Sequence, residues 1–402
     1  MKPIVGVVLA AAMALSFLQI CGSQKIGYSP LGLSTSHIPS IFNFGDSNSD
    51  TGSWSAAFGP FLPPNGVTFF GKPSGRASDG RLIIDFLAEK LGLPYLSAFL
   101  NSIGSNYRQG ANFAVSGATI QQSNGNMYDA DFNPLSLGIQ LSQFKQLKAR
   151  TAEFYEQAKD EDGKCNVLPE EDEFSRGLYT VDMGQNDLHY FLISMTEEQA
   201  KESISSIIDQ FAMVLEKLHQ LGARAFWIHN TGPIGCLPFF AVDDPEKPET
   251  TDQNGCVEAY NEVAQEFNTQ LKERVYKLRD QLPSSRITYV DIYSAKYDLI
   301  SNAAAYGFSN PLGYCCGQSH DFPCWQDVTI NGTDVYASSC NNPSEYISWD
   351  GIHYSEAANR WVADRIADGL YSDPPQTRVT EAHPNPRYVS VTSTLSRRRP
   401  GV

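Results

Sequence analysis

Short apolar segments alternate along this chain with longer amphipathic segments, and this alternation limits the fold more than any other feature. The apolar segments that read as strands cover residues 40–44, 112–115, 178–183, 225–230 and 287–292. Helical spacing of apolar residues occurs at residues 81–91, 203–221, 256–282 and 355–370. Strands that alternate with helices usually build a parallel sheet covered on both faces. The sequence therefore predicts a single α/β domain at residues 38–373, a three-layer sandwich with a five-stranded parallel sheet.

Composition supports a folded enzyme-sized domain and excludes several classes of partner. Of 402 residues, 42% are hydrophobic and only 19% are charged, so the chain has ample material for a core. With 30 basic and 45 acidic residues, the formal net charge is −15. This acidity argues against a nucleic-acid partner and against electrostatic docking onto anionic lipid.

The N-terminus has the pattern of a secretory signal peptide. Lys2 precedes an apolar run at residues 4–18, and the small residues Gly22 and Ser23 follow. The run is short and is interrupted by Gly6 and Ser16, which disfavours a membrane anchor. We therefore predict a signal peptide at residues 1–23, a secreted protein, and no stable membrane insertion.

Seven cysteines remain after the predicted signal peptide, and secretion makes disulfides their expected state. Because seven is odd, at least one cysteine lacks a partner within the chain, and Cys165 in its acidic surroundings is the expected one. Cys236 and Cys256 flank one loop and are expected to pair. The remaining candidates form a cluster at Cys315, Cys316, Cys324 and Cys340. The cluster lacks the paired C-x-x-C spacing of a zinc site, so we expect no metal there.

Three further segments are predicted to lie at the surface or in a terminal tail. Asn331 begins the sequon Asn-Gly-Thr and is predicted to be glycosylated. Residues 153–173 hold nine acidic and two basic side chains, which is typical of a solvated loop or helix end. Residues 374–402 are rich in proline and arginine and poor in apolar residues, so we predict a disordered basic tail.

Two segments carry residues suited to nucleophilic catalysis. Ser47 lies in Gly-Asp-Ser directly after the first predicted strand, where a turn can expose its hydroxyl at the sheet edge. Asp350 and His353 lie three residues apart, close enough for the carboxylate to hold the imidazole in one tautomer. Taken alone, each segment also fits ordinary turn chemistry, with Ser49 or Asp50 as a helix cap.

Two other predicted strand ends offer hydrogen-bond donors. Gly117 follows the second strand, and Asn186 follows the third. The backbone N–H of Gly117 and the side-chain amide of Asn186 would suit an oxyanion hole. A tight turn and a helix cap are the alternative interpretations of each by itself. Four such elements at the strand ends and last loop of one α/β chain favour the catalytic interpretation.

Together these blocks resemble the plant GDSL esterases/lipases of the SGNH hydrolase superfamily, in the early-nodulin-like branch. The blocks are Gly45-Asp46-Ser47, the segment 110–118, Gly184-Gln185-Asn186-Asp187 and Asp350-Gly351-Ile352-His353, and the resemblance runs from about residue 38 to residue 371.

The resemblance implies a flavodoxin-like sheet and a serine esterase that needs no cofactor. It implies Ser47 as nucleophile, His353 as general base and Asp350 as the residue that orients it. It further implies an oxyanion hole of the Ser47 and Gly117 N–H groups and the Asn186 side chain. Secretion to the cell wall or apoplast is implied, with the vacuole as the other destination.

Several questions stay open at this stage. The same acyl-enzyme would serve an acyltransferase. Some members of this branch carry fucosidase names, but glycoside hydrolysis needs two facing carboxylates and no such pair is recognisable. A non-catalytic secreted binding or defence protein is the third alternative. The substrate is expected to be a small-molecule or lipid ester, with Phe69, Phe70, Phe239 and Phe240 as pocket or core residues. Acyl specificity, disulfide connectivity and oligomeric state are not determined by the sequence.

Overall fold

A six-stranded sheet forms the centre of the computed structural model, which describes residues 38–122, 133–158, 166–317, 324, 327–330, 333–336, 338–375 and 377–382. In spatial order the strands are β10 (Ser372–Asp373), β5 (Arg286–Val290), β4 (Ala225–His229), β3 (Leu178–Asp182), β1 (Ile41–Gly45) and β2 (Gly110–Asn112). Strands β2, β1, β3, β4 and β5 are parallel, and their order 2-1-3-4-5 is the flavodoxin-like order. The predicted fold class is therefore confirmed.

The predicted strand count and one predicted strand position are wrong. Strand β10 pairs antiparallel with β5 and adds a sixth strand, because the chain after the last long helix covers the otherwise open edge of β5. Strand β2 ends at Asn112, whereas the apolar run predicted a strand at residues 112–115. Beyond Asn112, whose side chain accepts the Ala114 N–H at 3.0 Å, the segment still donates to β1 from Phe113 and Val115 but is no longer regular strand.

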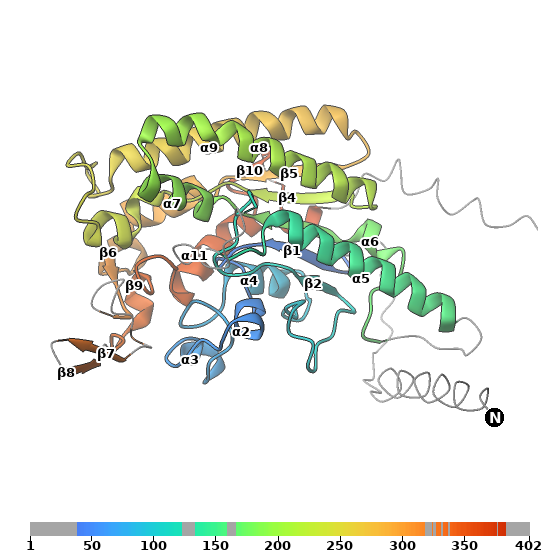
Figure 1. The fold of residues 1–402 in the computed structure, drawn as a ribbon, viewed down its shortest axis with the longest axis horizontal. Helices are drawn as coiled ribbons and strands as arrows, with labels where there is room; N and C mark the ends of the chain where they lie inside the picture. Colours follow the sequence, from blue (N-terminus) through green and yellow to red (C-terminus); the bar gives the residue numbers. More distant parts are fainter. Residues whose placement is uncertain are drawn as a thin grey trace, which may run out of the picture.

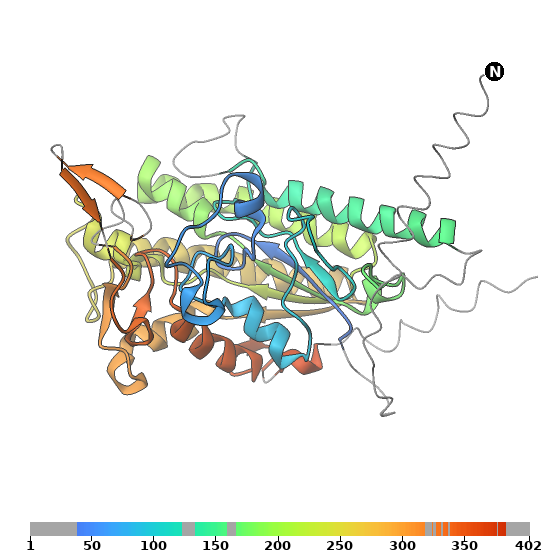
Figure 2. The same ribbon diagram turned by 90° about the horizontal axis from the view of Figure 1, so that it is seen from below.

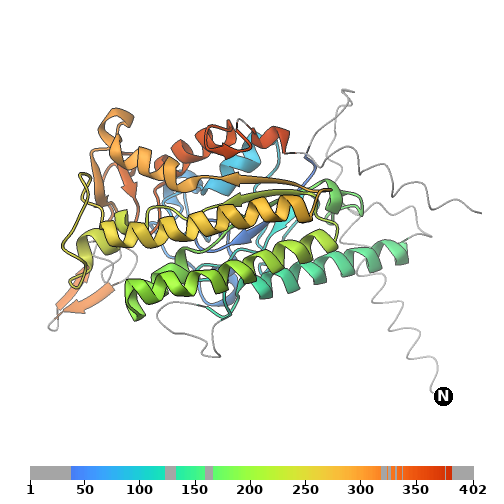
Figure 3. The ribbon, with the colours of Figure 1, turned by 90° about the horizontal axis from the view of Figure 1, so that it is seen from above.

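Helices cover both faces of the sheet. One layer holds α5 (Leu137–Gln157), α7 (Gln185–Ser194), α8 (Glu197–Gln220) and α9 (Glu258–Gln281), and Figure 3 shows α5, α8 and α9 side by side. The other layer holds α4 (Ile83–Lys90), α10 (Ile292–Ser301) and α11 (Glu356–Ala367) (Figure 2). The four predicted helices correspond to α4, α8, α9 and α11. None of the described helices is long and apolar enough to cross a membrane.

Shorter elements surround this three-layer body (Figure 1). They include the helices α2 (Ser53–Ala57), α3 (Val67–Phe70) and α6 (Glu173–Arg176), and a π-helix at Phe239–Asp243. They also include short 3-10 helices at Ile234–Cys236, Ala303–Tyr306, Pro343–Glu345 and Val379–Glu381. Strands β6 (Asn310–Tyr314) and β9 (Tyr346–Ser348) pair in parallel, and β7 (Asp327–Ile330) and β8 (Thr333–Tyr336) form a hairpin at one end of the molecule.

Aromatic packing fixes β1, the strand that leads to the predicted nucleophile. All five residues of β1 are buried. Phe42 contacts the rings of Phe144 and Tyr179, and Phe44 stacks on Phe113 with 5.1 Å between ring centroids. Because these rings come from β3, from α5 and from the residue directly after β2, they hold β1 against both neighbouring strands and the helix layer. The end of β1 is therefore a rigid platform.

Three disulfides are present among the described residues. Cys236 pairs with Cys256 as predicted, and the cluster forms the pairs Cys315–Cys340 and Cys316–Cys324. The cluster cysteines are thus cross-linked rather than arranged around a metal. Cys165, Asn331 and the predicted signal peptide lie outside the described residues.

The start of the predicted basic tail belongs to the folded body. Val379 and Ala382 are each 1% exposed and join the main hydrophobic core. The Arg279 guanidinium also donates to the Asp373 carboxylate, which holds the chain at this edge of the sheet. The boundary predicted at residue 373 is therefore too early, because two apolar residues suffice to dock a short segment. The remaining part of the predicted tail, residues 383–402, lies outside the described residues.

Candidate active site

The carboxyl ends of three neighbouring strands bring the candidate residues to one edge of the sheet. In the sheet register, Gly45 at the end of β1 pairs with Asp182 on β3, and Asp182 pairs with His229 on β4. Ser47 follows β1 by two residues and is 4% exposed. A tight turn places it there, because the Ser49 N–H donates to the Asp46 carbonyl at 3.1 Å. This is the sheet edge at which parallel α/β folds bind their ligands.

Asp350 and His353 form the hydrogen-bonded pair that their spacing predicts. The Nδ1 atom of His353 lies 2.6 Å from Asp350 Oδ2. Asp350 Oδ1 accepts the backbone N–H groups of His353 at 2.8 Å and Ile352 at 3.0 Å. One carboxylate therefore fixes both the turn and the orientation of the imidazole, with Nδ1 as the donor to it.

Electrostatics within this pair favour a basic imidazole. Burial by itself lowers the pKa of His353, but the charge and hydrogen bond of Asp350 outweigh it and raise that pKa above the ordinary value of 6.5. Burial likewise raises the pKa of Asp350, but His353 and two backbone donors lower it overall. The pair is thus a carboxylate that stabilises an imidazolium.

Ser47 and His353 come from opposite ends of the sequence, and the link between their segments is electrostatic. The charge of Asp46, the residue before Ser47, acts on the His353 ring and favours its protonated form. Among the described residues, however, Ser47 Oγ makes no hydrogen bond with His353. Such bonds are often long in an empty site and shorten with substrate. Direct pairing of hydroxyl and imidazole therefore stays a prediction.

The predicted oxyanion-hole residues lie around neighbouring loops. The Asn186 side chain donates to the Ala118 carbonyl at 2.9 Å, next to Gly117. Gly117 has φ of +77°, a conformation that favours glycine. The Asn48 side chain reaches Gln185 at 3.3 Å and so joins the serine turn to the start of α7. In the described part of the chain, neither the Ser47 N–H nor the Gly117 N–H donates to a protein acceptor.

Two aspartates hold these loops in place, and one of them, Asp50, was a helix-cap candidate in the sequence. Asp50 accepts four backbone N–H bonds, from Ser116 at 2.9 Å and from the first residues of α2 at Gly52, Ser53 and Trp54. Asp187 accepts from Ile120 at 2.9 Å and from Gln121 at 3.1 Å. Burial raises the pKa of Asp187 to about 7 despite these bonds. The bond between Ser116 and Asp50 and the two bonds to Asp187 span more than sixty residues, so no local pattern could have indicated them.

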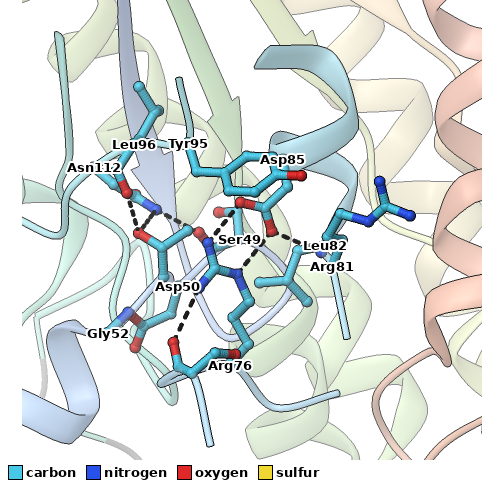
Figure 4. A network of polar contacts seen from close by, with 12 residues as sticks. Ser49, Asp50, Gly52, Arg76, Arg81, Leu82, Asp85, Tyr95, Leu96 and Asn112 are labelled. Carbon is cyan, nitrogen blue, oxygen red and sulfur yellow. Dashed lines mark hydrogen bonds and ion pairs between the residues drawn. The ribbon is translucent and has the colours of Figure 1, made fainter. Parts of the chain in front are cut away.

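A polar network behind the serine loop adds rigidity (Figure 4). The Asn112 side chain donates to the Ser49 carbonyl at 2.6 Å and to Thr51 Oγ1 at 2.9 Å. Nearby, the Arg76 guanidinium binds both oxygens of Asp85 at 2.6 and 2.7 Å (Figure 4). Asp85 is fully buried and also accepts the Leu82 N–H that starts α4. The loops on either side of Ser47 are therefore held by side chains as well as by the sheet.

The four phenylalanines proposed as pocket or core residues have different roles. Phe69 lies under the Arg81 guanidinium at 3.7 Å, and Phe70 lies under Arg76 at 4.7 Å. Phe240 is a core residue with 1% exposure. Phe239 is half-buried, and its N–H donates to the Gly351 carbonyl at 3.1 Å, inside the turn of Asp350 and His353. Of the four, Phe239 is therefore the one in contact with the candidate catalytic turn.

Among the described residues, no group of three or more His, Cys, Asp or Glu side chains is arranged to hold a metal ion. The groups at this edge of the sheet are a serine, a histidine, carboxylates and amide donors. These are the groups of covalent acyl transfer.

Comparison with known proteins gives a consistent result. The family model of the GDSL-like lipase/acylhydrolase matches residues 41–366. The Arabidopsis thaliana GDSL esterase/lipase At5g14450 is 50% identical over 85% of this chain and 88% of its own length. The Medicago truncatula GDSL esterase/lipase ENOD8 is 44% identical over 84% of this chain and 88% of its own length, which agrees with the early-nodulin-like branch.

Two other matches complete the comparison. A protein named alpha-L-fucosidase 3 from Arabidopsis thaliana is 45% identical over 83% of this chain and 91% of its own length. Among solved structures, an acetylxylan esterase catalytic mutant from Geobacillus stearothermophilus aligns with 13% identity and a TM-score of 0.34, over 82% of this chain and 92% of that one.

Proposed function

The chain belongs to the GDSL lipase/acylhydrolase family and is a carboxylic ester hydrolase, and from that premise we propose that Ser47 is its nucleophile, His353 its general base and Asp350 the carboxylate that orients the base. The observation that carries this proposal is the 2.6 Å contact between His353 Nδ1 and Asp350. It leaves Nε2 as the imidazole nitrogen that can accept a proton.

The reaction proceeds through an acyl-enzyme. Ser47 Oγ attacks the ester carbonyl carbon while His353 Nε2 takes up the hydroxyl proton. The tetrahedral oxyanion collapses, the C–O bond to the alcohol breaks, and His353 returns the proton to the leaving alkoxide. Water then attacks the acyl-enzyme by the same route and releases the carboxylic acid.

The oxyanion hole consists of the Ser47 N–H, the Gly117 N–H and one N–H of the Asn186 side chain. Buried backbone donors are nearly always paired in folded proteins. The two backbone N–H groups without a described acceptor are therefore available for the oxyanion. Asn186 uses one amide hydrogen for the Ala118 carbonyl and keeps the second.

Two rival activities differ from ester hydrolysis in testable ways. An acyltransferase would use the same acyl-enzyme with an alcohol in place of water, so product analysis with an added acceptor separates the two. A fucosidase would need two carboxylates facing each other across a sugar. Asp350 instead has its carboxylate occupied by His353 and two backbone N–H groups, which disfavours that role.

We further propose secretion to the cell wall or apoplast, with vacuolar delivery as the alternative. The three disulfides support an oxidising compartment. The substrate is a small-molecule or lipid ester. Glycosylation at Asn331 follows from the same route.

The decisive experiment is labelling with a serine-directed fluorophosphonate together with turnover of a panel of 4-nitrophenyl esters. We expect stoichiometric labelling at Ser47, and loss of labelling and turnover in Ser47→Ala. Ser116 and Ser49, which lie on neighbouring loops, are the matched controls, and their alanine variants should keep the label. Labelling at either of them in the native protein would overturn the assignment.

A further inference from the structure

Lys296, on α10, places a buried positive charge near the active site that the mechanism above does not use. The residue is 5% exposed, and its Nζ lies 4.5 Å from the ring centre of Tyr354, the neighbour of His353. Among the described residues its ammonium makes no hydrogen bond or close ion pair. Burying an unpaired ammonium is energetically costly, and an apolar side chain of similar length would fill the same space. Packing alone therefore does not explain a lysine here.

The charges of Asp182 and Asp46 act on this ammonium, and both residues lie at the carboxyl edge of the sheet. Asp182 on β3 and His229 on β4 are level with the end of β1, where Asp46 begins the serine turn. Asp46 Oδ1 accepts two bonds from Asn48, at 2.9 and 3.1 Å, whereas Asp46 Oδ2 is buried without a hydrogen bond. The Nδ1 atom of His229 lies 3.5 Å from the Oδ2 atom of Asp182. Among the described residues, Lys296 therefore interacts with these two carboxylates through charge, without a hydrogen bond or close ion pair.

Local structure directs Lys296 to this edge of the sheet. Asp291 caps α10 by accepting the Ser294 N–H at 3.0 Å, and Asn230 at the end of β4 donates to the same carboxylate at 2.9 Å. Gly232 leaves room for the lysine stem, because a Cβ there would lie 2.8 Å from Lys296 Cδ. The helix start and the β4 loop therefore fix where the ammonium lies.

We propose that Lys296 is a positioning residue of the hydrolysis: its ammonium favours the carboxylate forms of Asp46 and Asp182, and its positive charge opposes the effect of the Asp46 charge on His353. The inference deepens the proposed function and rests on it, because it concerns the base that accepts the Ser47 proton. It assigns Lys296 no contact with substrate.

The charges that act on His353 come from three elements, and their signs give the prediction. Asp350, on the same turn, and Asp46, after β1, favour the imidazolium, whereas Lys296 on α10 opposes it. Burial lowers the pKa of Lys296, but Asp182 and Asp46 act to raise it. Burial and Asp182 raise the pKa of Asp46 to about 7, and Lys296 opposes this. Removing the ammonium should therefore make His353 hold its proton to higher pH.

The experiment is the pH profile of kcat/KM for 4-nitrophenyl butyrate with Lys296→Met. Its acid limb should move to higher pH by about half a unit or more, the size expected when a unit charge is removed at several ångströms in a partly polar interior. Asp46 would bind a proton more readily in this variant and offset part of the shift. The change at Asp46 offsets only part of the shift in the acid limb, because Asp46, with a pKa of about 7, already carries less than a full negative charge near pH 7.

Lys148→Met is the matched control. Lys148, on α5, is half-buried, and its Nζ lies 5.7 Å from the ring centre of Phe174. Its acid limb should coincide with that of the native protein. An acid limb in Lys296→Met that stays within about 0.2 pH unit of the native one, in a variant that still takes the fluorophosphonate label, would overturn the proposal.

Asp182→Asn combined with Lys296→Met provides a second test should the single variant unfold. Neutralising both partners removes the uncompensated carboxylate, so the double variant should have a higher Tm than Lys296→Met. A Tm loss equal to the sum of the two single losses would show that the charges are not coupled. If Ser47→Ala kept its turnover, the proposed function would fail instead, whatever the lysine variants show.

Discussion

Replacing Asp350 with Asn tests the catalytic pair most directly, because the substitution keeps the shape of the side chain and removes its charge. The asparagine Oδ1 can still accept the N–H groups of Ile352 and His353, at the 3.0 and 2.8 Å that Asp350 now provides. The turn should therefore stay folded. What changes is the group that faces His353 Nδ1, which becomes an NH₂ donor in place of a carboxylate acceptor.

The expected loss follows from that exchange. A donor opposite Nδ1 favours the tautomer with its hydrogen on Nε2, and this tautomer cannot take up the Ser47 proton. The buried carboxylate, 5% exposed, also no longer stabilises the imidazolium. By analogy with other serine triads we expect kcat to fall by about four orders of magnitude, which corresponds to about 5 kcal/mol of activation free energy.

The assay is the initial rate of 4-nitrophenyl butyrate hydrolysis between pH 5 and 9, with a thermal melt to confirm folding. The native rate should fall as pH drops through a value above about 6.5, because Asp350 raises the pKa of His353 and only the neutral imidazole is a base. Glu356→Gln is the control. Its carboxylate binds Arg81 rather than His353, so kcat should change only severalfold. Near-native activity of Asp350→Asn at neutral pH would refute the assigned role.

Three other outcomes are expected. Asn186→Ala should lower kcat by about 10²–10³ with KM little changed, since its amide acts on the oxyanion; an effect confined to KM would contradict this. Arg76→Met should destabilise the fold by about 3–5 kcal/mol in denaturant unfolding, because it leaves Asp85 buried without its partner; a loss below 1 kcal/mol would argue against that cost. Replacing Cys236 and Cys256 together with Ser should cost about 3 kcal/mol, measured the same way, and an unchanged midpoint would show that this cross-link does not constrain the unfolded chain.

The sequence by itself determined the features that depend on local spacing. Apolar strands alternating with amphipathic helices predicted the parallel sheet, because a strand buried on both faces has to be apolar throughout. Asp350 and His353 were predicted to pair because three residues fit within one turn. Cys236 and Cys256 were predicted to pair because they flank one loop. Each of these predictions needed only a short stretch of chain.

Tertiary structure alone decided the features that depend on distant segments. Strand β10 joins the sheet because it meets the open edge of β5, and two residues of strand have no recognisable pattern. Asp187 holds a loop sixty-six residues away. Lys296 has no distinctive sequence pattern, yet the fold buries it where the charges of Asp46 and Asp182 act on its ammonium. Sheet register and helix packing determine these contacts between distant segments. Both depend on the packing of the whole core rather than on any local sequence.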